Sequence, residues 1–257
     1  MKKDNLFNMK RCTILLFLGL LLTPLTVSGF GVTWNTFLGH IYGWSIKVDG
    51  SGNVYVGGHA TSGWGTPVNP HSGGYDGFVA KLDNDGNVIW HTYIGSTGDD
   101  RINHIALDDA GNIYVTGEST STWGSPLHNH TGTGYYDILL AKLDNDGNLL
   151  WHTFWGSDWD DFNHDIALDG AGNIYVAGNS YGTWGSPINP HSGNYNHDIH
   201  AACFAPDGSE VWNTFFPTKV NYYNRGGIAV DASANVFVTG CSTVSYTHLR
   251  AHETKAN

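Results

Sequence analysis

The sequence predicts an all-β protein built from a repeated unit of four antiparallel strands. Glycine accounts for 34 of the 257 residues and aromatic side chains for 13%, whereas charged side chains account for only 14%. So few strong helix formers, with so many strand- and turn-forming residues, argue against a helical bundle. The hydrophobic fraction of 40% argues against a disordered chain. The clearest observation is an internal repeat of about 61 residues, which is the mark of a repeat architecture.

Two segments carry the repeat. Variants of VDGSGNVYVGG occupy residues 48–58, 107–117, 168–178 and 230–240. Variants of FVAKLDNDGNVIWHTYIG occupy residues 78–95 and 139–156 and, more loosely, 201–216. Trp90, Trp151 and Trp212 are 61 residues apart each time, and Trp34 holds the same position in a preceding unit. The repeat therefore runs through nearly the whole chain.

Each unit contains four runs with strand character. In the second complete unit they are residues 104–108, 112–119, 137–144 and 148–156. Within each pair of runs an Asp is followed three residues later by a Gly, which takes the positive φ of a hairpin turn. In the last unit Ala234 replaces that Gly, and a left-handed alanine costs roughly 1 kcal/mol. Two hairpins per unit give a four-stranded antiparallel sheet.

The predicted strands are apolar on both faces, because residues 113–115 (IYV) and 138–140 (ILL) are continuous apolar runs. A sheet with one face in water would alternate polar and apolar residues. Sheets that are covered on both faces and recur every ~40–60 residues are typical of the blades of a β-propeller. We expect a terminal strand at 32–39, three complete blades to about residue 216 and half of a fourth. A propeller closes with roughly 4–8 blades, so this set is incomplete.

The residues of the repeat also resemble a known family. The pattern D-x-F/L-V/L-A-K-L-D-x-x-G-N…W-x-T-[FY], followed by D-x-x-G-N-[VI]-Y-V-x-G, resembles the bacterial β-propeller repeat family called SBBP. The resemblance covers residues 32–243. It implies a β-propeller fold in an exported or cell-surface bacterial protein, and it implies no common catalytic residues.

The two ends are expected to lie outside the propeller domain, which we place at residues 30–243. Residues 1–29 are typical of a signal peptide, because four basic residues flank the start of an apolar run at 13–22 and small residues follow at 27–29. A retained signal anchor is the alternative. Residues 244–257 resemble the translation of a sequencing adapter and are interpreted as a non-native tail, the alternative being a native polar tail. We then expect the natural protein to continue beyond Thr243.

The charge balance limits the partners. Residues 30–243 carry 6 basic and 21 acidic residues, a net charge of −15, which would repel phosphate backbones and anionic membrane surfaces. We therefore expect a secreted or cell-surface protein that binds no nucleic acid and has no membrane span once the leader is removed. This domain contains Cys203 and Cys241. One disulfide is compatible with export, and the sequence leaves open whether the two cysteines pair.

A long loop between the second and third strands of each unit supplies the first candidate site. It contains the motif Trp-Gly-[Ser/Thr]-Pro followed by a His, and loops are where such scaffolds carry function. The candidate ligand-binding residues are Trp64, Trp123, Trp184, His71, His130 and His191. The three tryptophans would stack on sugar rings. The alternative is that each Trp packs its loop against its own blade, which the equal repetition in every unit favours.

Acidic and His residues supply weaker metal candidates. Residues 83–87 resemble the opening of a calcium loop, but Ile94 stands where an EF-hand has its Glu, and the same residues are ordinary in hairpin turns. The other candidate ligands are Asp99, Asp100, Asp160, Asp161, Asp198 and His200. Asp198 and His200 would lie on the same side of a strand. Solvated loop ends and chance polar substitutions are the alternatives, so no cofactor is expected and Ca²⁺ is the metal considered.

Catalytic signatures are weak. The match to G-x-S-x-G at 178–182 leads into a loop and not into the helix that a nucleophile elbow requires. Residues 83–90 resemble the tryptophan-docking strand of quinoprotein propellers, without recognisable cofactor-binding residues.

The sequence therefore predicts an exported, non-catalytic β-propeller module for surface display, adhesion, or carbohydrate or protein binding. One alternative is a fragment of a propeller enzyme, a polysaccharide hydrolase or lyase or a quinoprotein, whose active site lies in other blades. Another is a spacer in a larger surface protein. An acidic or His cluster found in one unit only, near the central channel, would favour the enzyme, whereas uniform loops in all blades favour binding or scaffolding. Open blade faces would expose apolar surface and lead to self-association.

Overall fold

The computed structural model describes residues 34–193, 197–218 and 226–240. The predicted signal peptide at 1–29, Cys241 and the predicted tail at 244–257 lie outside these ranges. Every regular element of the described residues is a β-strand. These residues contain no helix with the length and apolar character needed to span a membrane.

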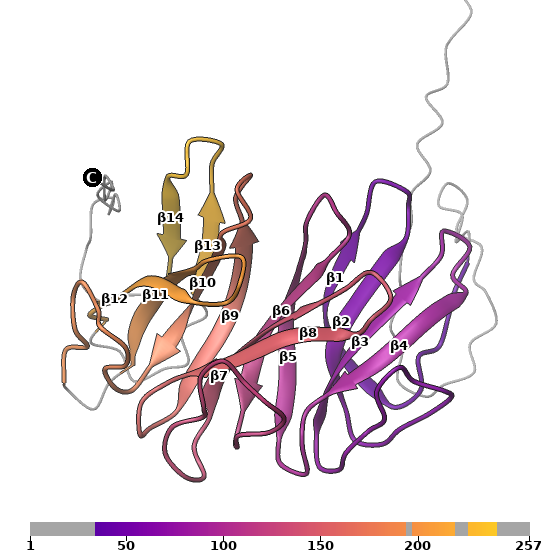
Figure 1. Cartoon of the computed structure of the whole chain (residues 1–257), viewed down its shortest axis with the longest axis horizontal. Helices are drawn as coiled ribbons and strands as arrows, with labels where there is room; N and C mark the ends of the chain where they lie inside the picture. The colour runs from indigo at the N-terminus through magenta and orange to yellow at the C-terminus, as the bar shows by residue number, and fades with distance from the viewer. Residues whose placement is uncertain (1–33, 194–196, 219–225, 241–257) are drawn as a thin grey trace, which may run out of the picture.

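The strands form three four-stranded antiparallel sheets and one hairpin, in chain order (Figure 1). Sheet 1 contains β1 (Ile41–Val48), β2 (Val54–Ala60), β3 (Asp76–Leu82) and β4 (Val88–Ile94). Sheet 2 contains β5 (Asp100–Leu107), β6 (Ile113–Ser119), β7 (Asp137–Leu143) and β8 (Leu149–Trp155). Sheet 3 contains β9 (Asp161–Leu168), β10 (Ile174–Ser180), β11 (Asp198–Phe204) and β12 (Glu210–Phe216). The hairpin pairs β13 (Gly227–Val230) with β14 (Val236–Thr239).

The sheets stand side by side in an arc, with sheet 1 at the right of Figure 1 and sheet 3 with the hairpin at the left. The first strands lie on the inside of the arc, because β1 packs against β5, β5 against β9 and β9 against β13. The fourth strand of each sheet is the far edge. The described sheets do not close into a ring, and this is the architecture of an incomplete β-propeller, as the sequence predicts.

Apolar side chains fill the space between neighbouring sheets. Tyr55 of sheet 1 shares a core with Ile105 of sheet 2, and Tyr114 of sheet 2 shares one with Ile166 of sheet 3. A third core joins sheet 3 to the hairpin. Sheet 2 is therefore covered on both faces, which explains why its strands are apolar without alternation.

A carboxylate closes six of the seven hairpin turns in the described ranges in the same way, and Ala205 stands at this position in the turn between β11 and β12. Oδ1 of Asp83 accepts hydrogen bonds from the backbone N–H groups of Asp85 and Asn87, and Oδ2 accepts one from the Asn87 side chain, at 2.8–2.9 Å. The same pattern recurs at Asp49, Asp108, Asp144, Asp169 and Asp231. Gly86 has a φ of 85°, and Ala234 has a φ of 59°, which confirms the predicted left-handed alanine. The turn itself thus accounts for the Asp-x-x-Gly-Asn motif.

The first strand of sheet 2 begins earlier than predicted. β5 starts at Asp100, whereas the sequence pattern predicts residue 104. Asp100 and Arg101 extend the strand because they lie opposite Ser119 and Glu118 of β6, so that polar residues at the end of this strand have polar neighbours. Asp100, and Asp161 at the same position of sheet 3, therefore begin strands and do not belong to loop ends.

The segment before β1 also corrects a prediction. Residues 34–39, the described part of the strand predicted at 32–39, form no strand. A strand needs a neighbour for its backbone N–H and C=O groups, and no strand of the described ranges pairs with this segment. Trp34 nevertheless takes the place that the repeat predicts. Its Nε1 donates to the carbonyl oxygen of Asn84 at 2.9 Å, just as Nε1 of Trp90 donates to Asn145 at 2.9 Å one unit later.

We call this contact the tryptophan staple: the Trp of one unit lies on the turn between the third and fourth strands of the next sheet. The three ring–turn pairs are Trp34 with Gly86, Trp90 with Gly147 and Trp151 with Gly208. A Cβ atom on any of these glycines would come within 3.0 Å of the ring. The turn glycines are thus required both by their positive φ and by the tryptophan that covers them.

Candidate ligand-binding site

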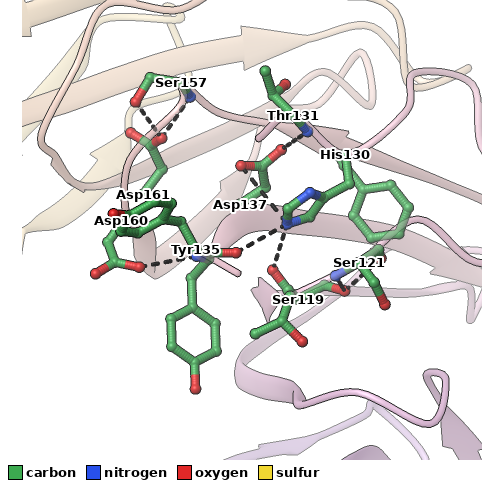
Figure 2. Close-up of polar contacts among 12 residues, drawn as sticks. Ser119, Ser121, His130, Thr131, Tyr135, Asp137, Ser157, Asp160 and Asp161 are labelled. Atoms are coloured by element: carbon green, nitrogen blue, oxygen red, sulfur yellow. Dashed lines mark hydrogen bonds and ion pairs between the residues drawn. The ribbon is translucent and has the colours of Figure 1, made fainter. Parts of the chain in front are cut away.

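In each long loop, a His and an Asp tie the loop to its sheet. Figure 2 shows the second loop, where Nε2 of His130 donates to the carbonyl oxygens of Ser119 and Tyr135, each at 3.1 Å. The same nitrogen lies 3.9 Å from Oδ1 of Asp137. Asp137 accepts the backbone N–H of Thr131 at 2.6 Å. Burial raises the pKa of Asp137 to about 8, so that this carboxyl is protonated near neutral pH.

The other two loops repeat this arrangement. His71 and His191 lie 3.3 Å and 3.1 Å from the last carbonyl oxygens of β2 and β10. Each is also within 4.0 Å of the Asp that begins the third strand, Asp76 or Asp198. Because the contacts are alike in three sheets, these residues form a framework that holds the loops.

Two of the three loop tryptophans stack on histidines of the fourth strands. The ring of Trp64 stacks on His91 with centroids 3.8 Å apart, and that of Trp123 stacks on His152 at 3.9 Å. Trp184 is only 4% exposed, so a sugar cannot stack on it in this arrangement. His91 and His152 also cover one face of the Trp64 ring and one face of the Trp123 ring, respectively. These contacts support the packing alternative, and sugar stacking on Trp64 and Trp123 stays a prediction.

In each of the two acidic pairs, Asp99–Asp100 and Asp160–Asp161, the second Asp belongs to the framework and the first lies nearer the surface. Asp100 and Asp161 are fully buried, and each accepts hydrogen bonds from the backbone and hydroxyl of the serine four residues earlier, as Figure 2 shows for Asp161. Burial raises the pKa of both carboxyls, that of Asp161 to about 7. Asp160 accepts a backbone N–H from the loop before β7 at 2.9 Å. Asp99 instead contacts Arg101.

Asp198 and His200 occupy alternate positions of β11 and hence the same face of sheet 3. Asp198 accepts backbone N–H groups of Ser192 and Thr218. His200 is completely buried, and burial lowers its pKa to about 3. Among the described residues, no group of three or more Asp, Glu, His or Cys side chains could hold a metal ion.

A different set of residues varies from sheet to sheet. In the first strands β1, β5 and β9, one repeat position near the long loops holds Tyr42, Arg101 and Phe162, respectively. Two residues later each strand has a β-bulge, which holds Trp44, Asn103 or His164. The end of the second strand holds His59, Glu118 and Asn179. Bulges re-aim side chains and occur next to functional sites. We call the group between sheets 1 and 2 the axial cluster: Tyr42, Trp44, His59, Tyr75, Asp99, Arg101, Glu118 and Tyr136.

Arg101 is the centre of the axial cluster. Its guanidinium lies 3.6 Å from carboxylate oxygens of both Asp99 and Glu118. Its Cζ atom lies over the rings of Tyr75 and Tyr136, 5.2 Å and 5.3 Å from their centroids. These are cation–π contacts. The side chain joins sheet 1, which supplies Tyr75, to sheet 2.

Glu118 and His59 are the buried titratable groups beside Arg101. Burial raises the pKa of Glu118, although Asn103 donates to its Oε2 at 2.7 Å. Burial, together with the positive charge of Arg101, lowers the pKa of His59 to about 4. His59 is therefore neutral near pH 7. Its ring stacks on Tyr42 with centroids 4.9 Å apart.

Sheet 3 adds an aromatic ring next to those of the axial cluster. The ring of Phe162 lies 5.6 Å from that of Tyr136. Nε2 of His164 donates to Oδ1 of Asn179 at 2.6 Å, and Nδ2 of Asn179 donates to His197 at 2.7 Å. The polar residues thus change from sheet to sheet, while aromatic rings recur along the same end of the arc.

Sequence analysis singled out Asp99 of the axial cluster and missed the other members. Glu118 lies in the strand predicted at 112–119, and Arg101 lies before the strand predicted at 104–108. Tyr75 and Tyr136 belong to the long loops and directly precede β3 and β7. The signal that could have found them is the alignment of the units with one another. Positions such as Tyr42, Arg101 and Phe162 differ in charge and type, whereas the turn and loop positions keep the same residues.

Stacked four-stranded antiparallel sheets with their first strands on the inside define this chain as a β-propeller protein. The family model for SBBP, the beta-propeller repeat, matches residues 89–122 and 151–183. The chain therefore contains SBBP repeats at two places. The first matched segment spans β5 and β6 with the Arg101 and Glu118 positions.

A crystal structure of a protein of unknown function from Bacteroides caccae is similar to this chain, with 10% sequence identity and a TM-score of 0.43. The match covers 78% of this chain and 54% of that protein, so that the chain spans about half of its length. No curated protein matches the chain.

Proposed function

We propose that this chain is part of an exported, non-catalytic β-propeller module that binds a carbohydrate or a protein at the cell surface. The observation that supports this function is the separation of two kinds of residue. Loop and turn residues are repeated in each sheet and hold the framework. Residues at the loop end of the inner strands differ from sheet to sheet and include the half-exposed Trp44 and the partly exposed Arg101.

This separation is what a binding scaffold requires. A site that recognises one ligand needs different groups at defined places, whereas a repeated framework residue serves stability in each sheet. Rigid strands position Arg101 and His59, which suits specific binding. Loops of nearly equal structure offer no comparable variety.

The propeller enzyme is the second candidate, because the axial cluster is an acidic and His-containing group of the kind that would favour it. Glu118 has a raised pKa, which is a common property of a general acid. Both of its oxygens are already engaged, however, Oε1 with Arg101 and Oε2 with Asn103. The most exposed large side chains of the cluster are instead the aromatic rings of Tyr42 and Trp44, and this favours binding over turnover.

The experiment immobilises the purified chain and probes it with a panel of polysaccharides and bacterial surface proteins, with analysis of each probe afterwards. We expect saturable binding of at least one probe, which is recovered intact. Shortened polysaccharide would establish the enzyme, and absence of binding across the panel would overturn the proposal. The double variant Tyr42→Ala/Arg101→Ala is compared with Trp64→Ala/Trp123→Ala. Loss of binding only in the second would move the site to the loops.

Export is tested separately. Residues 1–29 are fused to an alkaline phosphatase that is active only outside the cytoplasm. Activity with release of the processed reporter supports secretion, whereas activity retained on the membrane identifies a signal anchor. An inactive reporter contradicts export.

A further inference from the structure

We infer that the axial cluster binds a neutral oligosaccharide, whose rings stack on Tyr42 and Trp44. The inference rests on the proposed binding function and names the ligand class and the place. Tyr42 and Trp44 are 48% and 50% exposed, although they belong to the inner strand β1. Both rings contact the same His59 ring and so form one exposed apolar patch, and such patches mark interaction sites.

The two rings are held in position by a buried histidine. His59 stacks on Tyr42 at an interplanar angle of 20° and lies 6.1 Å from the ring of Trp44. An edge contact with Tyr75 at 5.3 Å fixes the other side of His59. One face of Tyr42 is therefore packed and its outer surface is open. The two exposed rings form a platform whose apolar surface matches that of a sugar ring.

Polar groups for sugar hydroxyls lie beside the platform. The side chains of Asp99 and Arg101 are 36% and 29% exposed, and they form an ion pair at 3.6 Å. A carboxylate accepts hydrogen bonds and a guanidinium donates them, so that together they match adjacent hydroxyl groups. Within the described ranges, Nδ1 of His59 and Nε of Arg101 have no hydrogen-bond partner.

The row of rings favours an oligosaccharide over a single sugar. From Tyr42 the rings continue through Tyr75 and Tyr136, on either side of Arg101, to Phe162 of sheet 3. The ligand is neutral because residues 30–243 have a net charge of −15, and the positive charge of Arg101 is already offset by Asp99 and Glu118. An anionic sugar would be repelled.

The test is titration of the full chain with hexasaccharides of β-linked glucose, xylose, mannose and N-acetylglucosamine, and with a hexamer of galacturonic acid. Binding is measured by calorimetry and by tryptophan fluorescence. We expect a neutral hexamer to bind, and Trp44→Ala to weaken it by roughly 10-fold or more, while Trp44→Phe keeps most of the affinity. The control is Phe237→Ala, an exposed aromatic residue of β14, which leaves affinity unchanged.

Each other outcome overturns the inference. Sugar binding that Trp44→Ala does not change places the site elsewhere, and preference for the galacturonic acid hexamer refutes the neutral class. A chain that binds surface proteins but none of the sugars retains the proposed function and loses this inference. Near-ultraviolet circular dichroism confirms that Trp44→Ala is folded.

Discussion

Ala234 occupies a left-handed position that glycine holds in the other Asp-x-x-Gly turns, with a φ of 59°. The Cβ atom is unfavourable there by roughly 1–2 kcal/mol, of which the greater freedom of glycine in the unfolded chain offsets part. We expect Ala234→Gly to raise the free energy of unfolding by roughly 0.5–1 kcal/mol, measured by urea denaturation. Gly111→Ala, where φ is 82°, is the reciprocal control and should lower it. A destabilising Ala234→Gly would contradict this account.

Asp137 gives the fold a pH dependence. Its pKa is raised by burial to about 8, against roughly 3.9 in an unfolded chain. The folded state therefore binds the proton more tightly, and the contribution to stability is complete below pH ~4 and is lost as the pH rises toward 8. We expect Asp137→Asn to reduce the fall in unfolding free energy between pH 5 and 8 by roughly 2 kcal/mol.

The variants are compared by denaturation at both pH values. The buried histidines His59 and His200, whose lowered pKa values act in the opposite direction, contribute equally to both proteins. The control is Asp83→Asn, since the pKa of that carboxyl is lowered by hydrogen bonds from Asn87 and it stays ionised throughout this range. An unchanged pH dependence in Asp137→Asn would show that the carboxyl is ionised in the fold.

At the scale of single residues, the sequence predicts repeated positions better than varied ones. The turn glycines and Ala234 follow from local backbone chemistry, which depends on a few neighbouring residues. The axial cluster joins Tyr75 of sheet 1 to Arg101 of sheet 2 across an interface between units. Such a contact depends on how sheets stack, and no motif within one unit indicates it.

The tryptophan staple is a contact between neighbouring units that recurs three times in the described residues. Nε1 of Trp90 donates to Asn145, and the ring covers Gly147. We expect Trp90→Phe to lower the free energy of unfolding by about 1 kcal/mol, because the hydrogen bond is lost. Trp90→Ala should lower it by roughly 2–4 kcal/mol, because the packing contacts of the ring are lost as well. Chemical denaturation gives both values. The exposed Ile89→Ala on the same strand is the control, and equal effects of all three would contradict the staple.

At the scale of elements, strand existence and hairpin pairing follow from the sequence, and strand ends do not. β5 begins at Asp100 because its polar start lies opposite β6, which local hydropathy cannot indicate. Residues 34–39 have the sequence of a fourth strand but form none, because strand formation depends on a partner and not on the segment alone.

The whole arc leaves one apolar face open. Ile46 and Val48 of β1 are 48% and 56% exposed, whereas Ile105, at the Ile46 position of the next unit, is fully buried. We expect the chain to self-associate through this face, since burying it recreates a contact between sheets. Light scattering after size exclusion should show oligomers.

Ile46→Lys/Val48→Lys should shift the chain to monomer. Ile89→Lys, at an equally exposed position of the outer strand β4, should leave the oligomers unchanged. A monodisperse wild-type monomer would refute association through the open face.

The direction of the tryptophan staple has a consequence for how such chains change over generations. Each staple tryptophan covers a turn glycine of the following sheet, namely Gly86, Gly147 or Gly208. A duplicated unit would therefore form the same contact with the units on both of its sides, and the neighbours of a deleted unit could still form it with each other. Unit number can then change in single steps while the inner residues diverge. Homologous chains should differ in length by multiples of about 61 residues and vary most where Tyr42, Arg101 and Phe162 stand.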